Sequence, residues 1–362
     1  LFQVKLSLGS NFFMEIAKLR AFRLLWAEMI RAFGGSESSQ KVWIHARTAA
    51  FNKSQFDLYV NLLRTANEAF AGVIGGADSL EVSRFDELVS EPDEFSAHLA
   101  RNQQIILAEE AHFAKVMDPA GGCYYIESLT HELANKAWAM MQDIESDGGM
   151  IKSLRAGKIH ELIRVVAEAR IDAANKRRDV YVGVNMFANV EEASQPLIKT
   201  NKAPRNSAVR LEAGPLPKRR AVQDLEQLRS GIAASKAERK IFLLTMGTIA
   251  DYKARADFAA GFFQVGAFEV ITGSGYLTVP EALEAAKSSG AKAICLCSTD
   301  DKYQELVPEI APALTGKTLI LAGYPTDKIE DYKAAGIDLF IHIRANVYTT
   351  LADLAKQMEV LS

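Results

Sequence analysis

The chain has 362 residues, of which 49% are apolar and 24% are charged, and its formal net charge is −3. This length allows two domains with separate cores, and the charge favours neither nucleic acid nor an anionic membrane as a partner. No apolar run reaches the roughly 18 residues of a membrane-spanning helix, and no signal-peptide pattern is present. Three cysteines do not suggest a disulfide framework, which favours a cytoplasmic protein. Because the chain opens at Leu1 rather than Met, we expect a processed chain or a fragment.

Strands that alternate with long helices are expected in residues 1–188. The expected strands are residues 4–8, 41–46 and 79–82, and the helices between them are residues 12–33 and a helix from Ser54 to Gly75. Three or four more helices are expected between residues 92 and 178. This alternation predicts β/α units around a parallel sheet. Since a complete (β/α)8 barrel needs about 250 residues, residues 1–188 are expected to be the C-terminal part of a TIM barrel whose beginning is missing.

Residues 189–238 are expected to be a linker, because they contain four prolines and no periodicity until about Ala221. Within residues 199–220, seven basic residues stand against the single acidic residue Glu212; the basic residues are Lys199, Lys202, Arg205, Arg210, Lys218, Arg219 and Arg220. Two interpretations stay open. The segment is either a solvated connector or a basic strap across an acidic neighbour.

Residues 239–362 contain five short apolar runs, at residues 241–244, 268–271, 293–297, 318–321 and 339–341. Helices are expected between them, starting near Lys253, Val279, Lys302, Asp327 and Asn346. Near-continuous apolar strands are typical of a parallel sheet covered on both faces. Five strands alternating with helices fit a flavodoxin-like, doubly wound domain.

The residues between 101 and 123 resemble a family signature. Arg101-Asn102, then Glu109-Glu110, then residues 115–122 (KVMDPAGG) are similar to the A-R-N … E-E … D-P-x-G-G-S signature of methylmalonyl-CoA mutases and related acyl-CoA mutases, with Cys123 in place of the usual Ser. Matching text lies on both sides, at residues 12–20, 75–76, 85–87, 148–150 and 182–185. The resemblance implies a partial TIM barrel followed by a cobalamin-binding-type domain.

Members of this family interconvert methylmalonyl-CoA and succinyl-CoA through radicals generated from adenosylcobalamin. The family's C-terminal domain holds the cofactor with D-x-H-x-x-G, and the corresponding residues here are Ile249, Asp251 and Ala254. A carboxylate is a poor match for an axial imidazole. Three further family motifs also differ at residues 297–299, 323–324 and 341–344, so the resemblance implies a degenerate ligand motif.

In the barrel part, His45 aligns with a family loop that faces the corrin, and Glu87 aligns with a position at the corrin rim. Two interpretations stay open: His45 and Glu87 are vestigial cofactor contacts, or the loop keeps the family's shape without a cofactor. We expect no catalytic residue, since no Ser-His-Asp or Cys-His arrangement is legible. We expect no metal ligand either, because Cys295 and Cys297 fit neighbours on a buried strand better than half a metal site.

Taken together, the resemblance implies the non-catalytic small subunit of a heterodimeric methylmalonyl-CoA mutase. The expected partner is a catalytic large subunit, which would bind adenosylcobalamin and the acyl-CoA substrate. No cofactor is expected on this chain, and neither nucleic acid nor a membrane is expected as a partner. Two alternatives stay open: a catalytic acyl-CoA mutase with divergent motifs, and a free-standing interaction module. An intact D-x-H-x-x-G would have favoured the enzyme.

Overall fold

The computed structural model describes residues 2–192, 195–198, 214–216 and 218–361. The chain divides into two compact units. The N-terminal unit comprises Leu1–Glu168 and Gln195–Arg220, and the C-terminal unit comprises Ala169–Ser194 and Ala221–Ser362. Each unit contains one parallel sheet, so the chain is an α/β protein, as predicted.

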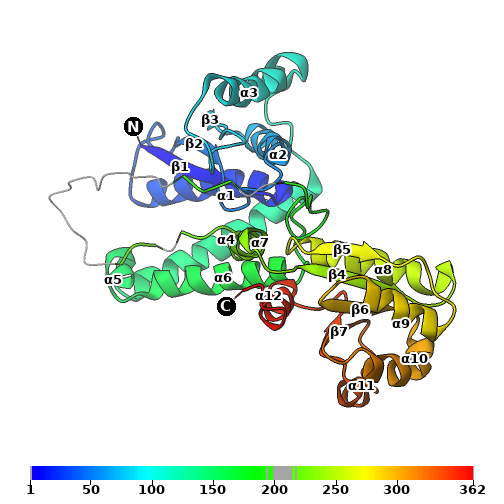
Figure 1. The fold of residues 1–362 in the computed structure, drawn as a ribbon. Helices are drawn as coiled ribbons and strands as arrows, with labels where there is room; N and C mark the ends of the chain where they lie inside the picture. The colour runs from blue at the N-terminus through cyan, green and yellow to red at the C-terminus, as the bar shows by residue number, and fades with distance from the viewer. Residues whose placement is uncertain (1, 193–194, 199–213, 217, 362) are drawn as a thin grey trace. The chain divides into compact units, whose positions relative to one another are not determined.

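The N-terminal sheet has the order β1-β2-β3, with all strands parallel. Its strands are β1 (Gln3–Leu8), β2 (Trp43–Thr48) and β3 (Ser79–Glu81). Apolar side chains alternate with polar ones along each strand, so each kind occupies one face. The apolar face packs against helices α1 (Phe12–Ala32) and α2 (Val60–Ile74) (Figure 1). The polar face carries the residues of the candidate site.

The expected helices after residue 92 are present. They are α3 (Glu94–Ile105), a π-helical turn (Ile106–Glu110), a 3-10 turn (Phe113–Lys115), α4 (Tyr124–Ser146), α5 (Gly149–Arg155) and α6 (Lys158–Asn175). Helix α3 begins where the Asp93 side chain accepts a hydrogen bond from the backbone N–H of Ser96. Helix α4 packs along α1, where Arg20 binds both Asp118 and Glu127. The signature segment thus ends at a junction held by ion pairs.

The prediction that a helix begins at Ser54 is wrong, because α2 begins at Val60. Asp57 has a φ of 49°, in the left-handed region that a right-handed helix excludes. Ser54 instead lies buried in a loop, where the side-chain amide of Asn61 donates to its carbonyl at 2.8 Å. Periodicity alone did not reveal this loop, because its residues are buried by tertiary contacts.

All five strands predicted in the C-terminal part are present within one residue at each end. They are β4 (Lys240–Thr245), β5 (Glu269–Thr272), β6 (Ala293–Cys297), β7 (Thr318–Ala322) and β8 (Leu339–Ile341). They pair in parallel in the order β5-β4-β6-β7-β8. The order reverses at β4, because the chain moves outward to β5 and then returns to the other side of β4.

Helices cover both faces of this sheet (Figure 1). One face packs against α7 (Gln223–Ala234), α8 (Ile249–Gln264) and α12 (Val347–Gln357). The other packs against α9 (Val279–Ser288), α10 (Asp300–Ala313) and α11 (Ile329–Ala335). Helix α8 begins earlier than the expected Lys253, because Thr248 and Asp251 form a capping box at its first turn.

The described ends of the linker contact the N-terminal unit. The backbone N–H of Ile198 donates to the Leu88 carbonyl at 2.9 Å, and the carbonyl of Gly214 lies 2.7 Å from a ring nitrogen of His160. Neither contact involves a basic linker side chain or an acidic neighbour, so neither supports the strap interpretation. Several charges on which that interpretation depends lie outside the described residues: Lys199, Lys202, Arg205, Arg210 and Glu212.

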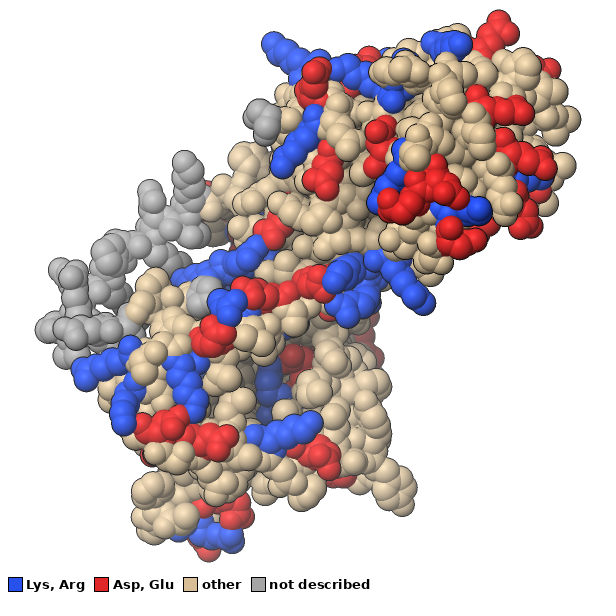
Figure 2. Space-filling view, turned by 90° about the horizontal axis from the view of Figure 1, so that it is seen from below, with Lys and Arg blue, Asp and Glu red and all other residues tan. Residues whose placement is uncertain are grey.

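Acidic and basic side chains are interspersed on the face shown in Figure 2, which agrees with the small net charge of −3. Within the part of the chain that the structure describes, no helix combines the length and the apolar character needed to cross a membrane.

Candidate functional site

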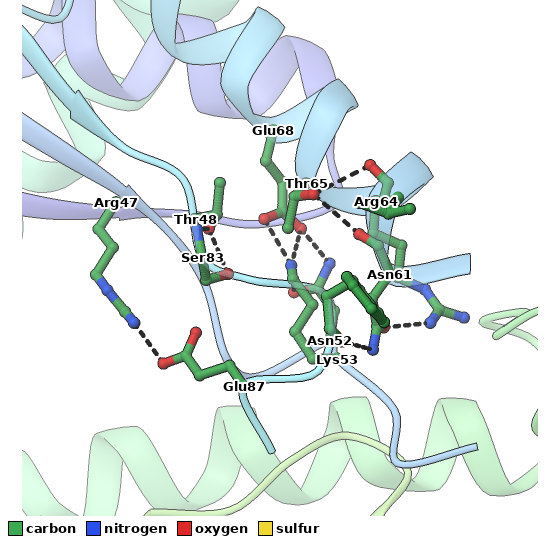
Figure 3. Close-up of polar contacts among 12 residues, drawn as sticks. Arg47, Thr48, Asn52, Lys53, Asn61, Arg64, Thr65, Glu68, Ser83 and Glu87 are labelled. Atoms are coloured by element: carbon green, nitrogen blue, oxygen red, sulfur yellow. Dashed lines mark hydrogen bonds and ion pairs between the residues drawn. The ribbon is translucent and has the colours of Figure 1, made fainter. Parts of the chain in front are cut away.

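His45 and Glu87, the predicted vestigial cofactor contacts, belong to one polar network on the N-terminal sheet. The His45 ring on β2 places Nδ1 2.9 Å from the Ser79 hydroxyl and Nε2 3.6 Å from the Glu81 carboxylate. Glu87, which follows β3, accepts a hydrogen bond from Arg47 (Figure 3). Both predicted residues are therefore held by neighbouring side chains.

Arg47 and Glu81 form the centre of this network. Arg47 Nε donates to Glu81 at 2.7 Å, and Lys5 Nζ donates to Glu81 at 3.0 Å. Partial burial would raise the pKa of Glu81, but the hydrogen bonds from Arg47 and Lys5 outweigh burial and lower this pKa to about 2. Neither Glu81 nor Lys5 was predicted from the sequence. The signal was present, because Lys5 pairs with His45, and Arg47 pairs with Glu81, on one face of adjacent strands.

Replacing Arg47 by Gln is expected to raise the pKa of Glu81 toward its ordinary value of 4.5. A carboxyl whose folded pKa is depressed stabilises the fold above its unfolded pKa, and this contribution is lost as pH falls through the folded pKa. Unfolding of the native chain should therefore show a Glu81 contribution that disappears between about pH 4.5 and pH 2.

Carbon-13 NMR titration of the Glu81 carboxyl in Arg47→Gln checks this expectation directly. The matched control is Arg31→Gln, which removes an exposed pair with Glu28 on α1 and should leave the Glu81 titration unchanged. An unaltered Glu81 titration in Arg47→Gln would show that Arg47 does not set this pKa.

A buried ion pair anchors the loop that follows β2. Lys53 Nζ lies 2.7 and 2.6 Å from the two carboxylate oxygens of Glu68 on α2, and the Asn52 side-chain amide donates to the same carboxylate at 2.6 Å (Figure 3). Burial lowers the pKa of Lys53 and raises that of Glu68, while their mutual attraction opposes both shifts. The sequence did not indicate this pair. Periodicity placed Lys53 immediately before the predicted helix and gave no sign of a buried loop.

The carboxyl ends of β4 and β6 form the second place where a ligand site is expected, because ligands of open α/β sheets bind where the strand order reverses. Here one oxygen of Asp251 accepts three hydrogen bonds. They come from the Thr248 backbone N–H at 2.7 Å, the Thr248 hydroxyl at 2.7 Å and Lys302 Nζ at 2.5 Å. The bonds from Lys302 and Thr248 lower the pKa of Asp251 to about 2, so the carboxylate stays charged.

This edge does not fit a corrin with an axial imidazole. The residue that aligns with the ligand is Asp251, a carboxylate that is bound by Thr248 and Lys302 through one oxygen. His342, the C-terminal unit's histidine, follows the outer strand β8, and its ring centroid lies 4.4 Å from that of Tyr324. A side chain added at Gly323 would meet Arg255 at 2.6 Å. The chain's own side chains thus occupy the space in which such a ligand would have to approach the backbone.

Cys295 and Cys297 are fully buried on β6, with their sulfur atoms 4.0 Å apart. Among the residues that the structure describes, no group of three or more His, Cys, Asp or Glu side chains is arranged to hold a metal ion.

Comparison with known proteins places this α/β chain in a family. The profile of the methylmalonyl-CoA mutase family matches residues 2–258. The chain is 35% identical over 347 residues to the methylmalonyl-CoA mutase small subunit of Porphyromonas gingivalis, which covers 95% of this chain and 56% of that protein. It is 33% identical over 324 residues to the small subunit of Propionibacterium freudenreichii, covering 86% of this chain and 48% of that protein.

A methylmalonyl-CoA mutase of Rhizobium meliloti is 39% identical over 228 residues, which cover 63% of this chain and 32% of that protein. The chain spans about half the length of the small subunits that it matches. It belongs to the methylmalonyl-CoA mutase family.

Proposed function

We propose that this chain is part of the small, non-catalytic subunit of a heterodimeric methylmalonyl-CoA mutase. In this proposal a catalytic large subunit binds adenosylcobalamin and the acyl-CoA, and the complex interconverts methylmalonyl-CoA and succinyl-CoA. The observation that carries the proposal is the contact between Asp251 and Lys302, because Asp251 aligns with the family's axial histidine and its carboxylate is already bound by Lys302.

The share of this chain that each relative covers supports a small subunit over a divergent catalytic mutase. The alignments with the two small subunits cover 95% and 86% of this chain, whereas the alignment with the Rhizobium mutase covers 63%. A free-standing interaction module has no comparable support, because the relatives named above are mutases or mutase subunits.

The proposal includes a specific fold and location. Residues 1–188 would be the C-terminal part of a TIM barrel, residues 189–238 a linker whose last part, α7, packs on the following domain, and residues 239–362 a flavodoxin-like domain. The order β5-β4-β6-β7-β8 supports the last assignment, because it is the flavodoxin order. His45 and Glu87 would be remnants of cofactor-facing positions, now held by Glu81 and Arg47. The proposed location is the cytoplasm.

Co-expression with a large subunit that retains D-x-H-x-x-G tests the proposal. The two chains are expected to elute as a 1:1 complex, and mutase turnover is expected only from the complex. The folded partner should also melt at a higher temperature in the complex, because a subunit that binds only the native state stabilises it by mass action.

Turnover by this chain alone with adenosylcobalamin would overturn the proposal in favour of a catalytic mutase. Separate elution of the two chains, with full activity in the large subunit alone, would also contradict it.

A further inference from the structure

Two ion pairs join helices that lie on opposite faces of the C-terminal sheet. Asp251 on α8 binds Lys302 on α10 at 2.5 Å, and Arg255 on α8 binds Asp300 at the start of α10 at 2.9 Å. Helix α8 belongs to one core cluster and α10 to the other. The pairs therefore cross the carboxyl edge of the sheet at the point where the strand order reverses.

The two pairs have opposite polarity, since α8 supplies one acid and one base and α10 supplies the other two. Sliding either helix would therefore break both pairs without creating new ones. Arg255 is held further by two contacts. It donates to the backbone carbonyl of Ala322, at the carboxyl end of β7, at 2.9 Å, and it lies 5.1 Å from the centre of the Tyr303 ring.

Glycines bring the backbone directly against these ion pairs. A Cβ added at Gly247 would lie 2.6 Å from Asp251 Oδ2 and 2.7 Å from Lys302 Nζ, and one added at Gly323 would lie 2.6 Å from Arg255 Nη1. Both glycines have positive φ values, of 98° and 157°. Bare backbone at a reversal point normally approaches a ligand, but here it approaches the chain's own ammonium and guanidinium groups.

We propose that Asp251–Lys302 and Arg255–Asp300 form a double latch that holds the reversal-point crevice of the C-terminal unit closed without any ligand. The latch is more than the loss of an axial ligand, because its two ion pairs crosslink two helical layers across the crevice. It concerns this chain alone and does not depend on the proposed heterodimer. Asp251 stays charged far below neutral pH, because hydrogen bonds from Lys302 and Thr248 lower its pKa to about 2.

Hydrogen–deuterium exchange on the full chain tests the latch. Lys302→Met is expected to speed amide exchange about threefold to fivefold in residues 246–252 and in residues 298–303 together, since each strand end loses its crosslink. The matched control is Lys253→Met. Lys253 pairs with Asp257 within α8, so its loss crosses no crevice and should leave both segments unchanged.

Two further measurements keep the test decisive if Lys302→Met fails to fold. Lys302→Arg keeps the charge and should keep native exchange. Raising NaCl to about 1 M screens ion pairs and should speed exchange of both segments in the native chain. Exchange that is insensitive to salt in the native chain, or equal effects of Lys253→Met and Lys302→Met, would overturn the latch.

Discussion

Replacing Lys53 by Met is expected to lower the free energy of unfolding by about 3–5 kcal/mol, because it leaves the Glu68 carboxylate buried without its cation. The side chains of Lys53 and Glu68 are only 3% and 1% exposed. Asn52 and the backbone N–H of Ala49 would still donate to Glu68, but neutral donors do not replace an ammonium group that contacts both carboxylate oxygens. Urea-induced unfolding followed by circular dichroism measures the loss.

Two controls separate the loss of one partner of a buried ion pair from the loss of a charge in general. Lys5→Met removes a pair with Glu81 whose side chains are 58% and 44% exposed, and such exposed pairs contribute about 0–1 kcal/mol. The double variant Lys53→Met/Glu68→Leu removes both buried charges and should recover most of the stability, since well-packed apolar replacements of buried ion pairs are often neutral. Equal losses in Lys53→Met and Lys5→Met would contradict the expectation.

Replacing Ile232 by Ala is expected to destabilise the C-terminal unit by about 2–5 kcal/mol, through lost burial and a residual cavity. Ile232 is fully buried, although it lies in the segment predicted to be a linker. Together with Leu225 and Leu228 it packs α7 against a core that includes Ile241 and Leu354. Thermal unfolding of the full chain measures the effect.

Gln227→Ala is the matched control, because Gln227 lies exposed on the same helix and should change stability by less than about 0.5 kcal/mol. A loss in Ile232→Ala no larger than that of the control would show that α7 does not stabilise the core.

The regular parts of this fold could be predicted from local patterns. The strands of the C-terminal sheet are apolar because both faces are covered, so each run stands out against its polar flanks. The same pattern predicted that Cys295 and Cys297 are neighbours on a buried strand. The helix expected from Ser54 failed for the opposite reason, because the buried loop of Asn52 and Lys53 depends on Glu68, a partner fifteen residues later.

The candidate site was predictable only in part. Family resemblance pointed to His45, Glu87 and Asp251, since each aligns with a known position. It did not identify what holds them, because Glu81 and Lys302 are distant in sequence and become neighbours only through strand pairing and helix placement. Substitution of a motif residue is visible in a sequence, whereas the new partner of the substituted residue is a property of the fold.

Polar and apolar side chains alternate along the strands of the N-terminal sheet. This alternation makes β2 sensitive to a one-residue insertion or deletion as well as to substitutions. Successive side chains point to opposite faces, so a one-residue shift exchanges the two faces. Such a shift would turn His45 and Arg47 toward α1 and would place Ile44 and Ala46 among Lys5, Ser79 and Glu81. The same residues that neutralise one another on the polar face would then be buried without partners. The charged network therefore also fixes the register of the strand that carries it.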